Sequence, residues 1–285
     1  MQHFHGSQLT FERSSAGILE VRLIREPASE IGLAMLAELE HVVEAMRASE
    51  VRALVISGTT KRGFCAGADL RELHHKNQER TRQGVSIDER VREVRSFLDR
   101  IHAVFDAIDE APCTTIAAVH GVCFGGGFEL ALTCDVIVAD RTARFGFPEL
   151  RLGLVPGFGG IPRLEREVGN AVVRDLVLTG RSLGATRAYE LGLVSQLVAE
   201  GEHLTVARRI AEQARRFDAH VTRAAKSFLK PIPKARLEEE KQVFCELFRS
   251  PTVETALSRF ESDKTAMPYL PSAESRAKSH NENIP

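Results

Sequence analysis

The sequence lacks the short motifs with which many enzymes hold a nucleotide or a metal ion. Residues 58–63, GTTKRG, are not followed by Lys-Ser or Lys-Thr, so they do not form a phosphate-binding P-loop. The glycines after Val119 lack the GxGxxG spacing and the acidic partner of a dinucleotide site. The ten histidines are scattered, with no HExxH and no Cys/His cluster, so we expect no metal site.

An excess of charge of either sign is also missing. The 38 basic and 39 acidic residues give a formal net charge of −1, which excludes a global attraction to nucleic acid or to an anionic membrane. The five cysteines form no CxxC pair, which is typical of small core residues in a reducing compartment. No charged-then-apolar leader and no apolar run of membrane-spanning length is present. We therefore expect a cytoplasmic protein with neither a nucleic-acid nor a membrane partner.

The most informative stretch is 117–149, AAVHGVCFGGGFELALTCDVIVADRTARFGFPE. An apolar run predicts a buried strand at 114–119, and the three glycines that follow let backbone N–H groups approach a ligand closely. A helix-forming segment then carries Glu129 in its first turn, and Glu149 follows among apolar side chains. Taken alone, a glutamate near a helix start is explained by the helix dipole. Together, the two carboxylates and the exposed N–H groups suit acid–base chemistry beside a developing oxyanion.

Three segments resemble the crotonase, or enoyl-CoA hydratase/isomerase, superfamily. They are CAGADL at 65–70, GGGFELALTCD at 125–135 and FGFPELRLGLVPGFGG at 145–160. The resemblance implies an α/β fold, a crotonase-like spiral of repeated ββα units with a C-terminal helical region. It divides the chain into a core at 1–198 with a CoA-thioester active site and a helical oligomerisation region at 199–267. The polar residues 268–285 are expected to form a disordered tail.

Hydrophobic patterning predicts the individual elements. Strands are expected at 9–13, 18–24, 51–57, 114–119 and 135–140. Helices are expected at 33–46, 88–108, 164–169, 171–179, 185–191, 204–217, 237–248 and 252–264. The charged segment before the second helix shows little apolar periodicity, and we expect a mobile lid at 74–87.

The resemblance also implies the chemistry. The N–H groups of Ala68 and Gly126 would form an oxyanion hole for the thioester enolate, where one donor is worth about 3 kcal/mol of barrier. Glu129 and Glu149 match the two catalytic glutamates of the hydratases, which hold one water between them, and the N–H of Gly157 matches a group that also positions this water. Retention of both glutamates favours an enoyl-CoA hydratase, which adds water to a 2-enoyl-CoA reversibly and in the syn sense, over an isomerase. No cofactor is implied, because coenzyme A is part of the substrate.

Contacts to coenzyme A and between subunits follow from the same resemblance. Arg71 stands where the family often has a phosphate-contacting cation, and Lys264 lies one place later than the usual lysine of the last helix. The expected CoA-binding residues are Arg25, Ala66, Asp69, Leu70, Arg71, Phe244, Phe260 and Lys264. Partners are therefore an acyl-CoA thioester and other copies of the chain, in a homotrimer or a dimer of trimers.

The sequence is also compatible with other reactions and roles. Within the same fold, the chain could be an enoyl-CoA isomerase, an acyl-CoA hydrolase or a decarboxylase, since PASEIG at 27–32 and GGIPRL at 159–164 depart from the usual family segments. Outside enzymes, the basic residues within 208–216 and 221–236 would suit an RNA-binding relative. The polar composition of 70–87 favours a short, branched or polar acyl group over a long fatty chain.

Overall fold

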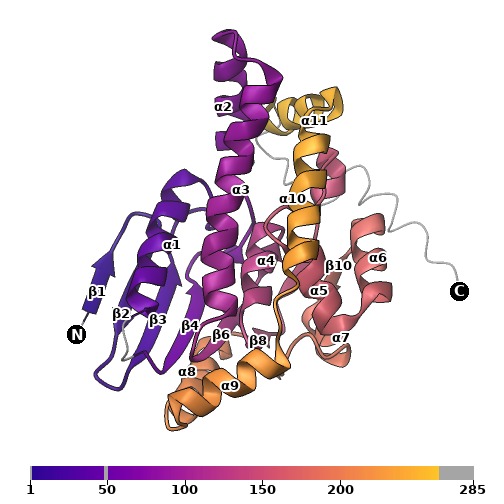
Figure 1. Ribbon diagram of the computed structural model, residues 1–285. Coiled ribbons are helices and arrows are strands. Elements are labelled where there is room, and N and C mark those ends of the chain that lie inside the picture. Colours follow the sequence, from indigo (N-terminus) through magenta and orange to yellow (C-terminus); the bar gives the residue numbers. More distant parts are fainter. Residues whose placement is uncertain (1, 48–50, 263–285) are drawn as a thin grey trace, which may run out of the picture.

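A computed structural model describes residues 2–47 and 51–262 of the chain (Figure 1). Within these residues the larger sheet has seven strands in the order β1-β2-β3-β4-β6-β8-β11. They are β1 (Gln2–His5), β2 (Leu9–Arg13), β3 (Ile18–Leu23), β4 (Ala53–Gly58), β6 (Thr114–Val119), β8 (Val136–Asp140) and β11 (Gln196–Val198). The pairs β1/β2 and β2/β3 are antiparallel, and the remaining pairs are parallel.

The smaller sheet supplies the second strand of each repeated unit. Its order is β10 (Ser182–Gly184), β9 (Arg144–Gly146), β7 (Val122–Phe124) and β5 (Gly63–Cys65). Along the chain, β4, β6 and β8 are followed by β5, β7 and β9, and each pair leads into a helical segment. This repetition confirms the expected spiral of ββα units.

Helices cover the sheets and form the C-terminal region (Figure 1). They are α1 (Leu33–Met46), α2 (Leu70–Arg82), α3 (Ile87–Asp109), α4 (Gly126–Thr133), α5 (Gly160–Val168), α6 (Asn170–Thr179), α7 (Ala185–Glu190), α8 (His203–Ala214), α9 (Ala219–Leu229), α10 (Lys234–Phe248) and α11 (Pro251–Ser262). All six residues of β4 are buried, as expected for a parallel strand covered on both faces. On one face, α8 packs Val206, Ala207 and Ala211 against β4, β6 and β8.

The expected lid at 74–87 is wrong for most of its length, because α2 continues to Arg82. Helical periodicity was hidden because two positions on the buried face are polar. His74 is 1% exposed and lies 2.9 Å from Glu261 of α11, and Asn77 accepts a hydrogen bond from Arg90 of α3 at 2.7 Å. A hydrophobicity pattern does not register a helix that buries its polar residues against partners on other helices.

The helix at 33–46 and the strand at 114–119 have the predicted bounds, whereas α9 was not predicted. α10 packs along α3, where Glu238 and Lys241 pair with Arg95 and Asp99. The expected tail at 268–285 and the CoA-binding candidate Lys264 lie outside the described residues.

Candidate active site

Two backbone N–H groups lie at the carboxyl ends of neighbouring parallel strands. β5 leads to Ala68 and β7 leads to Gly126, and these strands pair with each other. A Cβ placed on Gly126 would lie 3.4 Å from the Ala68 nitrogen, and one placed on Gly67 would lie 3.1 Å from the Gly126 nitrogen. Within the described part of the chain, neither N–H group has a protein acceptor. Both residues line one pocket, so two free donors are adjacent at its wall.

The turn into α4 depends on glycine. Gly125 has a φ of 49°, in the left-handed region that glycine adopts without strain. A Cβ at this position would also overlap Oε1 of Glu149, and a Cβ on Gly126 would lie 2.6 Å from the Phe158 ring. Side chains at these two positions would therefore fill the space between the N–H pair and the carboxylates.

Glu129 lies one turn into α4 and is held by the start of α5. Its Oε1 accepts hydrogen bonds from the N–H groups of Phe158 and Gly160, both at 2.8 Å. The residue is only 2% exposed. Burial raises the pKa of Glu129 to about 7, although the two N–H donors and the charge of Arg163 act in the opposite direction. Glu129 is thus a carboxylate that changes its charge near neutral pH.

Glu149 begins a 3₁₀ turn, Glu149–Leu152, and borders the same pocket. The residue is partly exposed, but its Oε2 is inaccessible and has no hydrogen-bond partner among the described residues. Desolvation of the carboxyl group and the charge of Glu129 raise the pKa of Glu149 well above its usual range. The two carboxyl groups are therefore expected to share one proton at neutral pH, with Glu149 protonated and Glu129 ionised.

A third buried carboxylate, Glu240 of α10, was missed by the sequence analysis. Its Oε1 accepts the N–H of Gly159 at 2.7 Å and its Oε2 accepts the N–H of Ile161 at 2.8 Å. Burial and the charge of Glu129 raise the pKa of Glu240 well above its usual range. A sequence signal for this residue does exist, because Leu237, Glu240 and Phe244 recur at helical spacing along one buried stripe.

Two further side chains fix the loop that joins these groups. Arg163 is fully buried, and its guanidinium donates to the carbonyl oxygens of Phe158 and Gly159 at 3.1 and 3.3 Å. Nε2 of His102 lies 2.8 Å from the carbonyl oxygen of Gly157. Burial lowers the pKa of His102 to about 4, so the imidazole is neutral and donates its Nε2–H to that carbonyl. Arg163 and His102 thus both fix the backbone segment that donates hydrogen bonds to Glu129.

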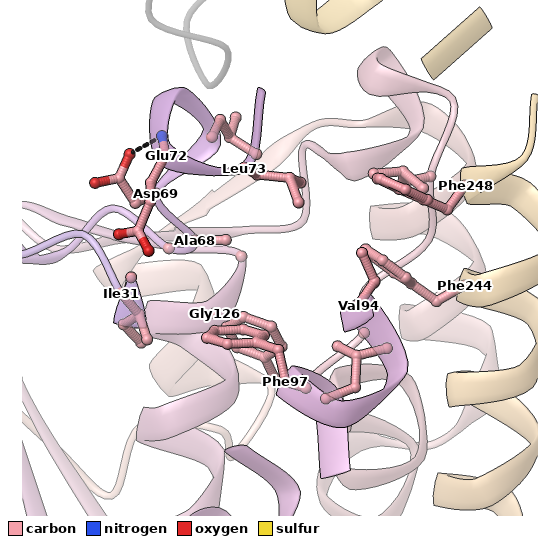
Figure 2. A pocket seen from close by; sticks show the side chains of 18 of the residues that line it. Ile31, Ala68, Asp69, Glu72, Leu73, Val94, Phe97, Gly126, Phe244 and Phe248 are labelled. Atoms are coloured by element: carbon pink, nitrogen blue, oxygen red, sulfur yellow. Dashed lines mark hydrogen bonds between the residues drawn. The ribbon is translucent and has the colours of Figure 1, made fainter. Parts of the chain in front are cut away.

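The pocket extends from the N–H pair to α2, α3 and α10. Its volume is about 1150 Å³, which includes the open solvent space at its mouth. Figure 2 shows Ala68 and Leu73 on one side of the space and Phe244 and Phe248 of α10 on the other. Phe158 lines the pocket, whereas Phe128 and Phe147 stack on each other in the core, with ring centroids 4.8 Å apart. Of Phe128, Phe147 and Phe158, only Phe158 therefore borders this space.

The N–H of Gly157, expected to position a water, has no protein acceptor within the described residues, and Gly157 lines the pocket. A Cβ on Gly157 would lie 2.5 Å from the Phe244 ring. The structure thus brings together five of the expected site residues around one pocket: Ala68, Gly126, Glu129, Glu149 and Gly157.

Apart from Arg25, which pairs with Asp69, and Lys264, which lies outside the described residues, the expected CoA-binding residues divide into two groups. Ala66, Asp69, Leu70 and Phe244 line the pocket. Asp69 caps α2 by accepting the N–H of Glu72 at 2.9 Å, and it forms an ion pair with Arg25, which limits the charge that Arg25 offers to a phosphate.

Arg71 and Phe260 form the second group, away from the pocket lining. The guanidinium carbon of Arg71 lies 4.8 Å from the centroid of the Phe260 ring, and Nη1 of Arg71 is 3.8 Å from Oε1 of Glu30. The Arg71 side chain is 42% exposed, so it can reach a charged group at the surface. This pair connects α2 to α11.

Comparisons with known proteins identify relatives of this chain. The model of the family described as Enoyl-CoA hydratase/isomerase matches residues 13–267. A protein of Rhizobium meliloti named probable enoyl-CoA hydratase is 35% identical over 237 residues, 81% of this chain and 86% of its own length. The short-chain-enoyl-CoA hydratase of Clostridium acetobutylicum is 36% identical over 179 residues, 62% of this chain and 64% of its own length.

Two solved structures have the same fold as this chain. The enoyl-CoA hydratase of Bacillus anthracis superimposes with a TM-score of 0.69 at 28% identity, covering 91% of this chain and 98% of that one. The enoyl-CoA hydratase of Bacillus halodurans, at 22% identity, shares the fold with a TM-score of 0.78 over 89% of this chain and 100% of its own. With the family match across most of the sequence, these similarities establish that the chain belongs to the enoyl-CoA hydratase/isomerase family.

Proposed function

We propose that this protein is an enoyl-CoA hydratase, which catalyses the reversible syn addition of water to a 2-enoyl-CoA thioester. One observation carries the proposal: two buried carboxyl groups with raised pKa values border the same pocket as two free, adjacent N–H donors. The names of the relatives from Rhizobium meliloti and Clostridium acetobutylicum support the same activity.

The proposed reaction gives each of these groups a separate role. Ionised Glu129 accepts a proton from a water, whose oxygen forms a bond to the β-carbon of the enoyl group. The electrons of the double bond move toward the thioester, and the N–H groups of Ala68 and Gly126 stabilise the negative charge on its oxygen. Glu149 then gives its proton to the α-carbon. Transfer of the proton from Glu129 to Glu149 restores the starting state.

The second carboxyl group favours hydration over the other reactions of this fold. Moving a double bond needs one group that removes and returns a proton, whereas adding water needs a base for the water and an acid for the carbon. The pKa of Glu129, raised to about 7, suits the base, whereas the pKa of Glu149, raised well above its usual range, suits the acid.

An RNA-binding role receives little support from the basic C-terminal segments. Arg208 is paired with Glu20, Lys226 with Asp135, and Lys230 with Asp109. These cations are already engaged with carboxylates, which weakens their attraction for phosphate.

The test is turnover of crotonyl-CoA in isotopically labelled water, with the product identified by mass spectrometry. We expect 3-hydroxybutyryl-CoA carrying the label on its hydroxyl oxygen. Glu129→Gln and Glu149→Gln should each lower kcat by about 10²–10⁴, while Glu190→Gln, on the exposed surface of α7, should leave it unchanged. Release of free coenzyme A instead of the hydroxy product would replace this proposal by thioester hydrolysis.

We also propose that the chain assembles as a homotrimer or a dimer of trimers through its C-terminal helices. α9 has no buried residue in the single chain. It nevertheless presents Phe228 at 86% and Leu229 at 76% exposure. Large apolar side chains exposed together on one helix are typical of a surface that another chain covers.

A further inference from the structure

One end of the active-site pocket is cationic. Between α2 and α3 the pocket is lined by Lys76, Asn77, Arg80, Arg90 and Glu93. Three cations and one carboxylate give this end a formal charge of +2. Glu93 is shared, because it lies 2.5 Å from Arg80 and 3.9 Å from Lys76.

Arg90 has no carboxylate partner among the described residues. Its Nη1 donates to Oδ1 of Asn77 at 2.7 Å, and Asn77 is a neutral side chain that is 9% exposed. The Nε of Arg90 is inaccessible and lacks a hydrogen-bond partner within the same residues. Asn77 therefore orients a full positive charge at the pocket wall without neutralising it.

The position of this charge follows from helix geometry. Arg90, Val94 and Phe97 all line the pocket, at the spacing that places side chains on one face of α3. The Phe97 ring lies 5.8 Å from the Phe158 ring, which in turn borders Gly126. Arg90 precedes Phe97 by seven positions, so its Cα lies about 10 Å further along the helix axis.

The pocket-lining side chains of α2 also change from apolar to cationic along the helix. Leu73 lines the pocket near the N–H pair, and Arg80 lines it seven residues later, close to the turn between α2 and α3. Leu73, Val94 and Phe97 form an apolar middle section (Figure 2). An acyl chain bound with its thioester at Ala68 and Gly126 would pass this section before it reaches the cations.

We infer that the pocket is built for an acyl group with a carboxylate at its far end, which Arg90 binds. This inference rests on the proposed function, since the thioester must lie at the N–H pair. A guanidinium pairs with a carboxylate through two parallel hydrogen bonds. The methyl end of a fatty chain at the same place would desolvate Arg90 without giving it a partner, so the site both attracts the acid and disfavours the neutral chain.

Binding of unreactive thioesters tests the subsite without any turnover. The probes are adipoyl-CoA and hexanoyl-CoA, which share a six-carbon chain and differ in the distal carboxylate, and the matched eight-carbon pair suberoyl-CoA and octanoyl-CoA. Isothermal titration with the whole protein should give at least a tenfold lower Kd for the acid in one of these pairs. Arg90→Gln should bring the two Kd values within about twofold, and Arg90→Lys should keep part of the preference.

Arg92→Gln is the matched control, because Arg92 lies on the same helix, carries the same charge and is 70% exposed. It should keep the full preference. Equal Kd values for acid and neutral thioesters in both pairs of the unmodified protein, or a preference that survives Arg90→Gln with an unchanged melting temperature, would overturn the subsite. If the unmodified protein does not hydrate crotonyl-CoA but still prefers the acid thioesters, the proposed reaction is rejected. The carboxylate subsite would not be affected by that result.

Discussion

Glu129 and Glu240 bind alternate N–H groups of one turn: Glu129 accepts from Phe158 and Gly160, and Glu240 accepts from Gly159 and Ile161. The first carboxylate comes from the core and the second from a C-terminal helix. Since the four donors are consecutive, movement of either carboxylate changes the backbone that holds the other. Glu240 is thus a positioning residue for the candidate base.

Replacing Glu240 should therefore affect both stability and catalysis. In Glu240→Gln one N–H keeps an oxygen acceptor, while the other faces an NH₂ group and loses its bond. An unsatisfied buried donor costs about 1–3 kcal/mol, which we expect as the loss in free energy of unfolding by urea. The value of kcat for crotonyl-CoA should also fall, with a smaller change in KM.

Glu239→Gln provides the control for this variant. Glu239 is the neighbouring residue on α10, where it is exposed and paired with Arg236. It should change neither property. If Glu240→Gln unfolds at the same urea concentration as the unmodified protein, Glu240 does not hold the turn.

The stability of Glu149→Gln should depend on pH in a defined direction. The pKa of Glu149 is raised in the folded protein, so its protonated form is favoured there. The associated stability is fully present below the pKa of the unfolded chain and is lost as the pH rises through the folded pKa. Glutamine resembles the protonated form and does not ionise.

We therefore expect the melting temperature of Glu149→Gln, relative to the unmodified protein, to increase between pH 5 and pH 9. The variant should be the more stable protein at the alkaline end despite its loss of activity. A difference that stays constant across this range would show that Glu149 ionises normally in the folded protein.

The pH dependence of turnover should report Glu129. The base must be ionised, and burial raises the pKa of Glu129 to about 7. The value of kcat/KM should thus decrease as the pH falls below about 7, tenfold for each further pH unit. Any residual activity of Glu129→Gln should lack this decrease.

A methyl group at the candidate oxyanion hole should prevent turnover without unfolding the protein. In Gly126→Ala the added Cβ would lie 2.6 Å from the Phe158 ring and 3.4 Å from the Ala68 nitrogen. It would occupy space needed by the thioester oxygen, so kcat/KM should fall by at least about 10². Gly184→Ala, where a Cβ meets nothing within 4 Å, should retain activity.

Assembly should depend on the apolar side chains of α9. The double variant Phe228→Ser, Leu229→Ser removes two side chains that are largely exposed in the single chain. Light scattering should show a trimer or a larger assembly for the unmodified protein and a shift toward a monomer of 31.5 kDa for the variant. An unmodified protein that is monomeric at micromolar concentration would contradict the proposed assembly.

Local sequence determined much of this protein. Runs of apolar residues bounded by glycine predicted β6, and apolar residues at helical spacing predicted α1, because burial and backbone conformation are imposed locally there. Glu129 and Glu149 could be singled out because each lies close to the glycines or apolar residues of its own segment.

Other features of the site depend on contacts between residues far apart in the sequence. Glu240 lies 81 residues from Gly159. Its place in the buried stripe of α10 marks it as buried, but its partners depend on how α10 packs across the site. The helix α2 and the free charge of Arg90 were hidden for a related reason: His74 and Asn77 occupy buried positions with polar side chains whose partners lie on other helices. Hydrophobic periodicity reports burial of apolar groups, whereas pairing between distant polar groups is fixed only when the chain has folded.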